Sequence, residues 1–190
     1  MGIDLDKEAI NYVQNKVKNK DNLIVVQGNF RDIDKIAHLN KFDKVQGILF
    51  DFGVSSYQLE NADRGFSYLR EGPLDMRMDP ESKIKASDLI NLLGKNELYK
   101  IFTELGEERF ARDISFAIVS ARREKAIMTT EDLVKVIAQA LGIKERNLTP
   151  MKRAEIAKRA FQALRMEVNA EINSLKEVLD SCPSLLQSSG

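Results

Sequence analysis

One apolar segment of the chain stops on an acidic residue and then turns polar, and this feature most restricts how the chain can fold. Residues 47–51 read Gly-Ile-Leu-Phe-Asp, and residues 53–58 supply glycine, serine and amide side chains. A short apolar strand that ends on a carboxylate and opens into a polar loop is how a parallel α/β sheet forms a ligand site at its carboxyl edge. The sequence therefore predicts a binding site around Asp51.

Short apolar segments alternate with amphipathic ones in the first part of the chain. Strands are expected at residues 2–4, 23–26 and 45–51, and helices at 7–17 and 33–39. Alternation of this kind favours parallel β-α-β units. We therefore predict an α/β fold built on a parallel sheet.

The strands disappear after a loop at residues 52–80. From residue 87 onward the apolar spacing is helical, and the last helix is predicted to run from about residue 150 to about residue 180. Capping and glycine signals mark the expected helix ends at Gly94, Gly106, Gly142, Thr129 with Asp132, and Thr149 with Pro150. This part of the chain is predicted to be all-helical.

Composition excludes some classes of protein. The 190 residues are 43% hydrophobic and 31% charged with a net charge of zero, which allows one good core or two small ones. No apolar run approaches the ~20 residues that span a bilayer, so we predict a soluble, cytoplasmic protein. A single cysteine, Cys182, and a single histidine, His38, exclude an internal disulfide and a zinc site of Cys/His type. No metal site is predicted.

Two acidic residues compete for one role after the first predicted strand. An acid just before a helix can accept hydrogen bonds from the hydroxyls of a ribose, as in nucleotide-binding α/β folds. Asp6 fits better as the helix N-cap, which leaves Asp4 as the ribose partner. On local grounds alone, the simpler interpretation that both acids cap the helix is preferred.

Aromatic and polar side chains follow the other two predicted strands. Phe30 comes after a glycine turn and can stack on a flat ligand or, equally well, fill the core beneath the loop. Asp51 would be costly beside the core unless it holds a ligand or backbone N–H groups, so we favour a binding role, with Gln58 as a nearby donor and acceptor. The acids in residues 75–79 fit either a polar-substrate site or a salt-bridged loop.

Residues 151–165 form a basic stretch. Its only acid is Glu155, and its cations are Lys152, Arg153, Lys158, Arg159 and Arg165. On an exposed helix such cations would form a track for RNA phosphates, and an ordinary solvated helix face is the alternative. A second basic set could extend the track: Arg122, Arg123 and Lys125.

Five motifs follow one another along the chain. They are residues 47–59, Arg-Gly-Phe-Ser at 64–67, residues 72–79, Gly-Glu-Glu-Arg at 106–109, and Phe-Gln-Ala-Leu-Arg with Val-Asn at 161–169. In this order and spacing they resemble the MraW/RsmH family, the rRNA small subunit methyltransferase H enzymes. The resemblance covers most of the chain.

The resemblance implies a class I S-adenosylmethionine-dependent methyltransferase, with a Rossmann-like parallel sheet and an inserted all-helical subdomain. The implied reaction is methylation of N4 of a cytidine in the decoding region of small-subunit (16S) ribosomal RNA. Asp4 would bind the ribose of S-adenosylmethionine, and Phe30, Asp51 and Gln58 would line its adenosine and methionine ends. The resemblance does not lead us to name a catalytic base.

The same resemblance implies a domain organisation. Residues 1–80 would be the partial Rossmann-like cofactor-binding domain with the active-site loop, residues 81–165 the inserted helical subdomain that recognises RNA, and residues 166–190 a helix that returns to the first domain. The expected partner is small-subunit ribosomal RNA or the assembled small subunit, without a membrane. The alternative is a non-catalytic RNA-binding helical module with a vestigial nucleotide pocket.

The sequence also departs from the family pattern. Family members begin with a strand and a Gly-Gly-His-type loop and continue past the last helix with further strands, which this sequence lacks. Glu155 and Ile156 stand where the family usually has His-Pro, which puts in doubt whatever contact that histidine makes. We therefore expect an internal fragment that is inactive in methyl transfer by itself and binds the cofactor weakly.

Overall fold

The computed structural model describes residues 1–17 and 22–188 of the chain. Packing divides the chain into two compact units. Met1–Phe52 and Ala170–Gly190 form the first, called the sheet unit below, and Gly53–Asn169 form the second, called the helical unit. Each unit has its own hydrophobic core.

The sheet unit contains the first predicted β-α-β segment. β1(Gly2–Asp4) and β2(Val25–Gln27) pair in parallel, with Asp4 opposite Gln27. α1(Lys7–Lys16) lies between them in the sequence. Because the pairing is parallel, the carboxyl ends of both strands lie at the same edge. The prediction of a parallel pair at this place is confirmed.

The predicted third strand at residues 45–51 is wrong. Val45 forms an isolated parallel bridge with Leu186, and residues 46–51 belong to no strand. A strand needs a neighbour that takes up its backbone N–H and C=O groups, and no described residue pairs with 46–51 as a strand does. Accordingly, Leu49 is 93% exposed. The sheet of the described residues has two strands, and a larger Rossmann-like sheet stays a prediction.

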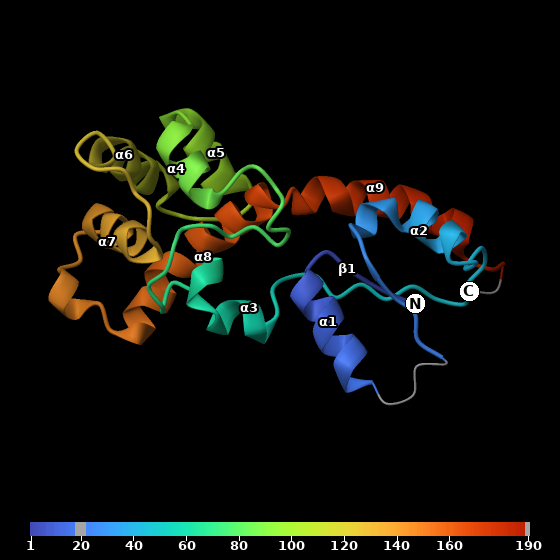
Figure 1. The fold of residues 1–190 in the computed structure, drawn as a ribbon. Helices are drawn as coiled ribbons and strands as arrows, with labels where there is room; N and C mark the ends of the chain where they lie inside the picture. Colours follow the sequence, from blue (N-terminus) through green and yellow to red (C-terminus); the bar gives the residue numbers. More distant parts are fainter. Residues whose placement is uncertain (18–21, 189–190) are drawn as a thin grey trace. The chain divides into compact units, whose positions relative to one another are not determined.

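Helices supply the core of the sheet unit. η1(Phe30–Asp32) leads into α2(Ile33–Leu39), and α9(Glu171–Leu185) packs along both (Figure 1). The buried hydrophobic cluster formed there is small: Ile33, Ala37, Val178, Cys182 and Leu185. Cys182 is a free thiol, and its burial raises its pKa.

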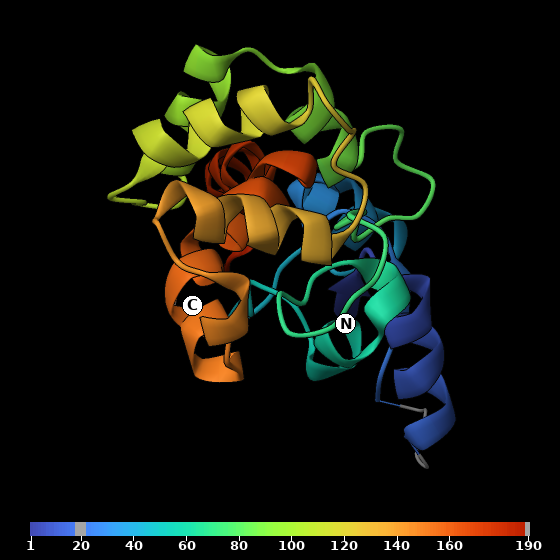
Figure 2. The same cartoon turned by 90° about the vertical axis from the view of Figure 1, so that its left-hand side faces the viewer.

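The helical unit surrounds one long helix. α8(Pro150–Val168) packs against α4(Ala86–Leu92), α5(Lys95–Glu104) and α7(Thr130–Ala140) (Figures 1 and 2). Its buried face includes three alanines without exposed surface, Ala157, Ala160 and Ala163, and small side chains let neighbouring helices approach closely. The other elements are α3(Ser56–Glu60), η2(Ala62–Arg64), α6(Ala111–Ala121) and η3(Glu145–Asn147). Across the described parts of both units, no helix combines the length and apolarity needed to cross a bilayer.

The predicted helix-end signals are confirmed. Helices begin or end beside each of them: Gly94, Gly106, Gly142, Thr129 with Asp132, and Thr149 with Pro150. At the start of α7, the N–H of Asp132 donates to Thr129 Oγ1 at 3.0 Å, and the Asp132 carboxylate accepts the N–H of Thr129 at 3.2 Å. Each side chain thus takes up a backbone group that the first helical turn leaves free.

The last predicted helix is two helices, so the prediction of one helix to residue 180 is wrong. α8 ends at Val168, and Ala170 adopts a left-handed conformation with φ of 48°. Asn169 holds the break: its Nδ2 donates to the carbonyls of Met76 and Arg165, both at 2.8 Å, and its Oδ1 accepts the N–H of Met78 at 2.7 Å. A left-handed residue ends a helix. The apolar stripe concealed the break because it runs through both helices.

The loop at residues 61–80 packs with the helical unit. Phe66, Leu74 and Met76 are part of that unit's core. Along the chain, the boundaries between the packing units therefore fall after Phe52 and after Asn169. The boundaries of the predicted functional domains fall instead after residues 80 and 165. The division into functional domains stays a prediction.

Candidate functional site

Asp4 lies at the carboxyl end of β1, and Asp6 caps the helix that follows. Asp6 Oδ1 accepts the N–H of Glu8 at 2.9 Å, which confirms Asp6 as the N-cap of α1. Asp4 Oδ1 accepts the N–H of Asp6 at 2.8 Å. Protein atoms around the Asp4 carboxyl remove part of its hydration and raise its pKa above the ordinary value, although the hydrogen bond from Asp6 opposes this effect. The two acids thus have different environments.

Phe30 follows β2 at the same edge of the sheet. The N–H of Gly28 donates to the carbonyl of Asp4 at 2.9 Å, which ties the exits of the two strands together. The ring of Phe30 contacts those of Phe50 and Phe52, with centroids 6.4 and 5.3 Å away. Phe52 is 49% exposed, so the cluster is packed on one side and open on another. Either use that the sequence allowed for Phe30 is compatible with this geometry.

Asp51 lies between the two phenylalanines of this cluster, Phe50 and Phe52. It is exposed and follows no strand, so the cost of burying a carboxylate, on which the sequence argument depended, does not arise in this structure. Among the described residues its side chain has no hydrogen-bond partner. The structure therefore brings Phe30 close to the residues that flank Asp51, and a binding role for Asp51 stays a prediction.

Gln58 belongs to the helical unit and is buried. It completes the N-terminal cap of α3: its Oε1 accepts the N–H of Ser55 at 3.0 Å, and its own N–H donates to Ser55 Oγ at 3.2 Å. Gln58 thus fixes the turn that opens this unit. Its predicted contact with a cofactor remains a prediction.

An ion pair holds the loop at residues 61–80 together. Arg77 binds Asp75 through two hydrogen bonds of 2.7 and 2.9 Å, and both side chains are 16% exposed. Burial alone would raise the pKa of the Asp75 carboxyl, but the hydrogen bonds and charge of Arg77 hold it below its usual range. Of the two interpretations left open by the sequence, the salt-bridged loop describes this segment.

Further contacts fix the backbone of the same loop. Arg64 Nη2 donates to the carbonyls of Arg77 and Met78 at 3.2 and 3.0 Å. Met76 has no exposed surface and a φ of 63°. A Cβ on Gly65, where φ is 70°, would lie 2.1 Å from a backbone oxygen. These contacts fix the backbone of the loop, so its motif residues have a structural role.

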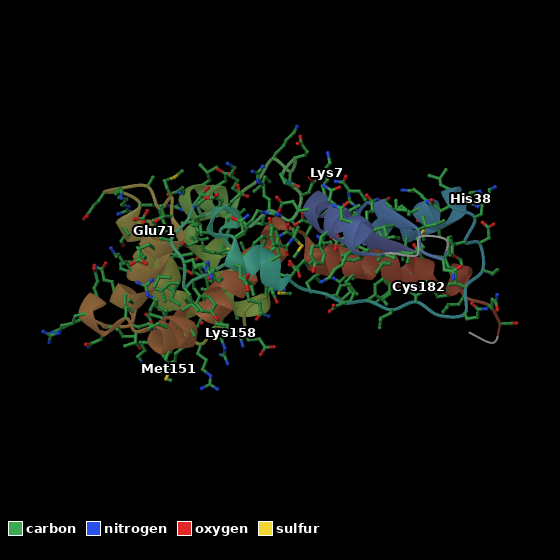
Figure 3. All side chains as sticks on the ribbon, turned by 60° about the horizontal axis from the view of Figure 1, so that its bottom comes forward. Lys7, His38, Glu71, Met151, Lys158 and Cys182 are labelled. Carbon is green, nitrogen blue, oxygen red and sulfur yellow. The ribbon has the colours of Figure 1, made fainter. Side chains whose placement is uncertain are left out.

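Four of the five predicted RNA-binding cations occupy one side of α8. At 100° per residue, Lys152, Lys158, Arg159 and Arg165 fall within one half of the helix. Lys158 and Arg159 are exposed and the other two are partly buried. Figure 3 shows the side chain of Lys158 extending away from α8. Lys152 is paired with Glu155 at 2.7 Å.

Arg153 faces a different direction. Its guanidinium forms a two-point ion pair with Glu131 of α7, with Nη2 3.0 Å from Oε1 and Nη1 on Oε2. The hydrogen bonds from Arg153 lower the pKa of Glu131, and Glu131 in turn raises the pKa of Arg153. The structure therefore gives Arg153 a structural role between two helices, away from the exposed side of α8.

The second basic set, at residues 122–125, is partly engaged in packing. Arg122 Nη1 donates to the carbonyl of Ile90 at 2.5 Å, and Lys125 lies 3.5 Å from Asp132. Arg123 is exposed. These residues hold α6 against α4 and α7, so they offer less free charge than the sequence suggests.

The helical unit contains a groove that the sequence did not indicate. This groove has a volume of about 700 Å³ and lies between the start of α6, the end of α7 and the start of α8. We call it the Phe110 groove after its exposed aromatic side chain; Arg109, Asp113, Lys152 and Arg159 also line it. The motif at residues 106–109 was the available signal, but nothing in the sequence indicated that it lies beside α8.

The described residues contain no cluster of three or more His, Cys, Asp or Glu side chains arranged to hold a metal ion.

Comparison with known proteins identifies the family of this chain. All of it, residues 1–190, matches the family model described as the MraW methylase family. The chain belongs to the MraW methylase family. It is 42% identical over 190 residues to the protein named "Ribosomal RNA small subunit methyltransferase H" of Clostridium botulinum strain Loch Maree, and 41% identical over 191 residues to that of Carboxydothermus hydrogenoformans. The protein of the same name from Caldicellulosiruptor bescii is 42% identical.

The match covers this MraW-family chain completely but its relatives only in part. In each of these comparisons the alignment covers 100% of this chain and 60% of the relative. The chain thus spans about 60% of the length of the curated relatives it matches. The resemblance found in the five sequence motifs is confirmed.

Proposed function

We propose that this MraW-family chain is part of an S-adenosylmethionine-dependent methyltransferase that methylates N4 of a cytidine in the decoding region of small-subunit ribosomal RNA. Its family membership along all 190 residues carries the proposal. The names of its relatives, which state a ribosomal RNA small subunit methyltransferase, support the substrate class. The N4 position and the cytidine come from the family resemblance.

The edge of the sheet unit fits a nucleoside-like cofactor. The exposed carboxylate of Asp4 has acceptor positions for ribose hydroxyls. The half-exposed ring of Phe52, packed with Phe30 and Phe50, offers a flat apolar surface for an adenine. When bound, S-adenosylmethionine supplies a methyl group that is already activated. Asp51 and Gln58 are the other proposed contacts of the cofactor.

The chain's task is then to orient the acceptor amine and exclude water. Correct orientation of two reactants is worth roughly 7–11 kcal/mol of the barrier. The N4 lone pair of cytosine is delocalised into its ring, so a carboxylate or carbonyl that accepts an N4–H hydrogen bond would increase density on nitrogen and balance the developing charge. The Asp51 carboxylate is exposed and has no hydrogen-bond partner among the described residues. Because Asp51 is also a proposed contact of the cofactor, we do not assign it, or any other residue, as the general base.

The helical unit would bind the RNA. Lys152, Lys158, Arg159 and Arg165 share one side of α8, and cations on an exposed helix attract phosphates by releasing condensed counterions. Arg153 was predicted as a fifth contact, but its ion pair with Glu131 makes it a poor phosphate ligand. We therefore retain four of the five cations in the proposal.

A chimera tests this function. Residues 1–190 replace the matching segment of the Clostridium botulinum relative, and methyl transfer to unmethylated small ribosomal subunits is followed by mass spectrometry of the nucleosides. We expect N4-methylcytidine, its loss in Asp51→Ala, and normal activity in Asp43→Ala, an exposed acid of the same unit. A folded chimera that methylates another base, or none, contradicts the proposal.

One observation favours a second candidate, a non-catalytic RNA-binding helical module with a vestigial nucleotide pocket. The sheet of the described residues has two strands, and a two-stranded sheet is marginally stable by itself. For the same reason we propose that the 190-residue chain alone transfers methyl groups negligibly. Robust turnover on small-subunit RNA by this chain alone would contradict that expectation, and RNA binding by a chimera without any methylation would favour the module.

A further inference from the structure

The turn at residues 106–109 is held against α8 by its backbone. A Cβ on Gly106 would lie 2.7 Å from the carbonyl oxygen of Arg159 and 2.9 Å from that of Phe102. Only glycine permits this approach. The next residue, Glu107, has a φ of 49°, a conformation that costs a residue with a side chain roughly 1–3 kcal/mol. Such strain is maintained only where the surroundings determine the conformation.

Side chains fix the same turn from two directions. Arg159 Nη1 donates to the carbonyl of Glu107 at 2.9 Å. Glu108 Oε1 accepts the N–H of Phe110 at 3.0 Å. These two hydrogen bonds hold the backbone on either side of Arg109, so Arg109 and Phe110 are presented from a rigid turn. Both line the Phe110 groove.

The exposed groups of the groove match the face and the edge of a nucleobase. Phe110 is 50% exposed, and unstacked bases in single-stranded RNA stack on such aromatic rings. Among the described residues, the side chains of Arg109 and Asp113 have neither a hydrogen-bond nor an ion-pair partner. A guanidinium supplies donors and a carboxylate supplies acceptors, which are the two kinds of group that a base edge requires.

The charges of the groove favour a base over a phosphate. Its three cations, Arg109, Lys152 and Arg159, are matched by three acids, Glu108, Asp113 and Glu155. Lys152 already pairs with Glu155 at 2.7 Å. A phosphate would meet these carboxylates unfavourably, whereas a neutral base with donors and acceptors would not. The volume of about 700 Å³ lies within the range of about 300–1,000 Å³ that is common for small-ligand sites.

We propose that the Phe110 groove binds one unstacked nucleobase of the RNA substrate, with the base on the ring of Phe110 and its edge on Arg109 and Asp113. This proposal rests on the proposed RNA-directed function. Lys152 and Arg159 belong both to the groove and to the cationic side of α8, so the RNA backbone can pass from one to the other. The groove thus selects single-stranded RNA, because a base inside a duplex cannot reach the ring.

Binding of two RNA hexamers tests the groove. Fluorescein-labelled hexauridylate and a matched abasic hexamer are titrated with the 190-residue chain, and binding is followed by fluorescence anisotropy. We expect Phe110→Ala to weaken hexauridylate binding about tenfold and to leave abasic binding unchanged. Phe116→Ala is the matched control, because Phe116 is 63% exposed on α6, the helix that begins after Phe110, and lies outside the groove.

A second variant removes the ring but keeps an apolar side chain. Phe110→Leu is expected to weaken hexauridylate binding nearly as much as Phe110→Ala, with circular dichroism showing that both variants fold. Unchanged affinity in both variants, while Lys158→Gln binds more weakly, overturns the groove and leaves the proposed function standing. Equal losses in Phe110→Ala and Phe116→Ala also overturn it. Failure of the wild-type chain to bind either hexamer overturns the groove and the RNA-binding role together.

Discussion

Two segments that carry family motifs, residues 45–52 and residues 61–80, differ in how they are held. In residues 45–52, Val45 makes one isolated bridge, Leu49 is 93% exposed and Asp51 is exposed. In residues 61–80, Asp75, Arg77 and Arg64 form a bonded network, and Met76 has no exposed surface. Both segments contain glycine and carry family motifs, yet only the second is fixed by hydrogen bonds among its own residues.

The difference shows where each conformation is specified. The loop at 61–80 takes its conformation from contacts inside the helical unit, including the two hydrogen bonds that join Asn169 to Met76 and Met78. Residues 45–52 have fewer such contacts: one bridge at Val45 and the ring contacts of Phe50 and Phe52 with Phe30. The helical unit is therefore expected to respond strongly to changes in its loop, and the sheet unit to respond weakly to changes at residues 45–52.

The largest effect is expected for Gly65→Ala. The new methyl group would lie 2.1 Å from the carbonyl oxygen of Pro73, at a φ of 70°, and should lower the free energy of unfolding by about 3 kcal/mol. Urea denaturation followed by far-ultraviolet circular dichroism measures the change. Gly47→Ala is the control in the other segment, because no atom lies within 4 Å of its added Cβ, and its effect should stay below ~0.5 kcal/mol. Equal losses of stability in Gly65→Ala and Gly47→Ala would contradict the proposed difference between the two segments.

A smaller loss is expected for Asn169→Ala. The substitution leaves the N–H of Met78 and the carbonyl of Met76 without their partner, which should lower the free energy of unfolding by about 2 kcal/mol. The same urea titration measures it. Asn147→Ala, at an exposed position in η3, should change little. If the two variants were equally stable, Asn169 would not be what fastens the loop.

The ion pair of the loop should make stability depend on pH. The pKa of Asp75 is lower in the folded chain than its ordinary value because of Arg77. Its contribution is therefore complete above the unfolded pKa of about 4, and is lost as the pH falls through the folded pKa. Unfolding titrations from pH 7 to pH 2 should show a weaker acid dependence for Asp75→Asn than for the wild-type chain. Asp63→Asn, an exposed acid of the same loop, should retain the wild-type dependence.

The smallest expected effect concerns RNA affinity. Lys158→Gln removes one exposed cation of α8 and should reduce the slope of log affinity against log salt concentration by about 0.7 for single-stranded RNA. Arg153→Gln should leave that slope unchanged and lower stability instead, because Arg153 is paired with Glu131. Anisotropy titrations of a labelled RNA hexamer at several salt concentrations separate the two. A smaller salt slope in Arg153→Gln with unchanged stability would instead show that Arg153 contacts the RNA.

Much of the fold was predictable because local signals are strong there. Caps such as Thr129 with Asp132 and Thr149 with Pro150 marked the helix ends correctly, since they act through hydrogen bonds within one turn. The third strand failed because pairing is not local: residues 45–51 read as a strand, but the described residues give them no partner. The break at Asn169 was missed because it depends on Met76 and Met78, about ninety residues earlier.

The site was predictable in its residue types more than in their partners. Asp6 was correctly separated from Asp4 because a helix start dictates its cap. Arg153 looked like its basic neighbours, and only its contact with Glu131 distinguishes it. The Phe110 groove was not found because it is formed by residues up to fifty positions apart, from Arg109 to Arg159. The sequence supplied the motif at residues 106–109 without showing what it faces.

We propose that the carboxyl edge of β1 and β2 holds the nucleoside part of the cofactor. The most direct test of this proposal is a series of ¹H–¹⁵N spectra of the 190-residue chain during titration with S-adenosylhomocysteine, which detects weak binding residue by residue. We expect shifts at Asp4, Gly28 and Phe30 and around Asp51, which disappear in Asp4→Ala and persist in Asp43→Ala. A folded chain whose spectra show no shifts at these residues, even at saturating ligand, would contradict it.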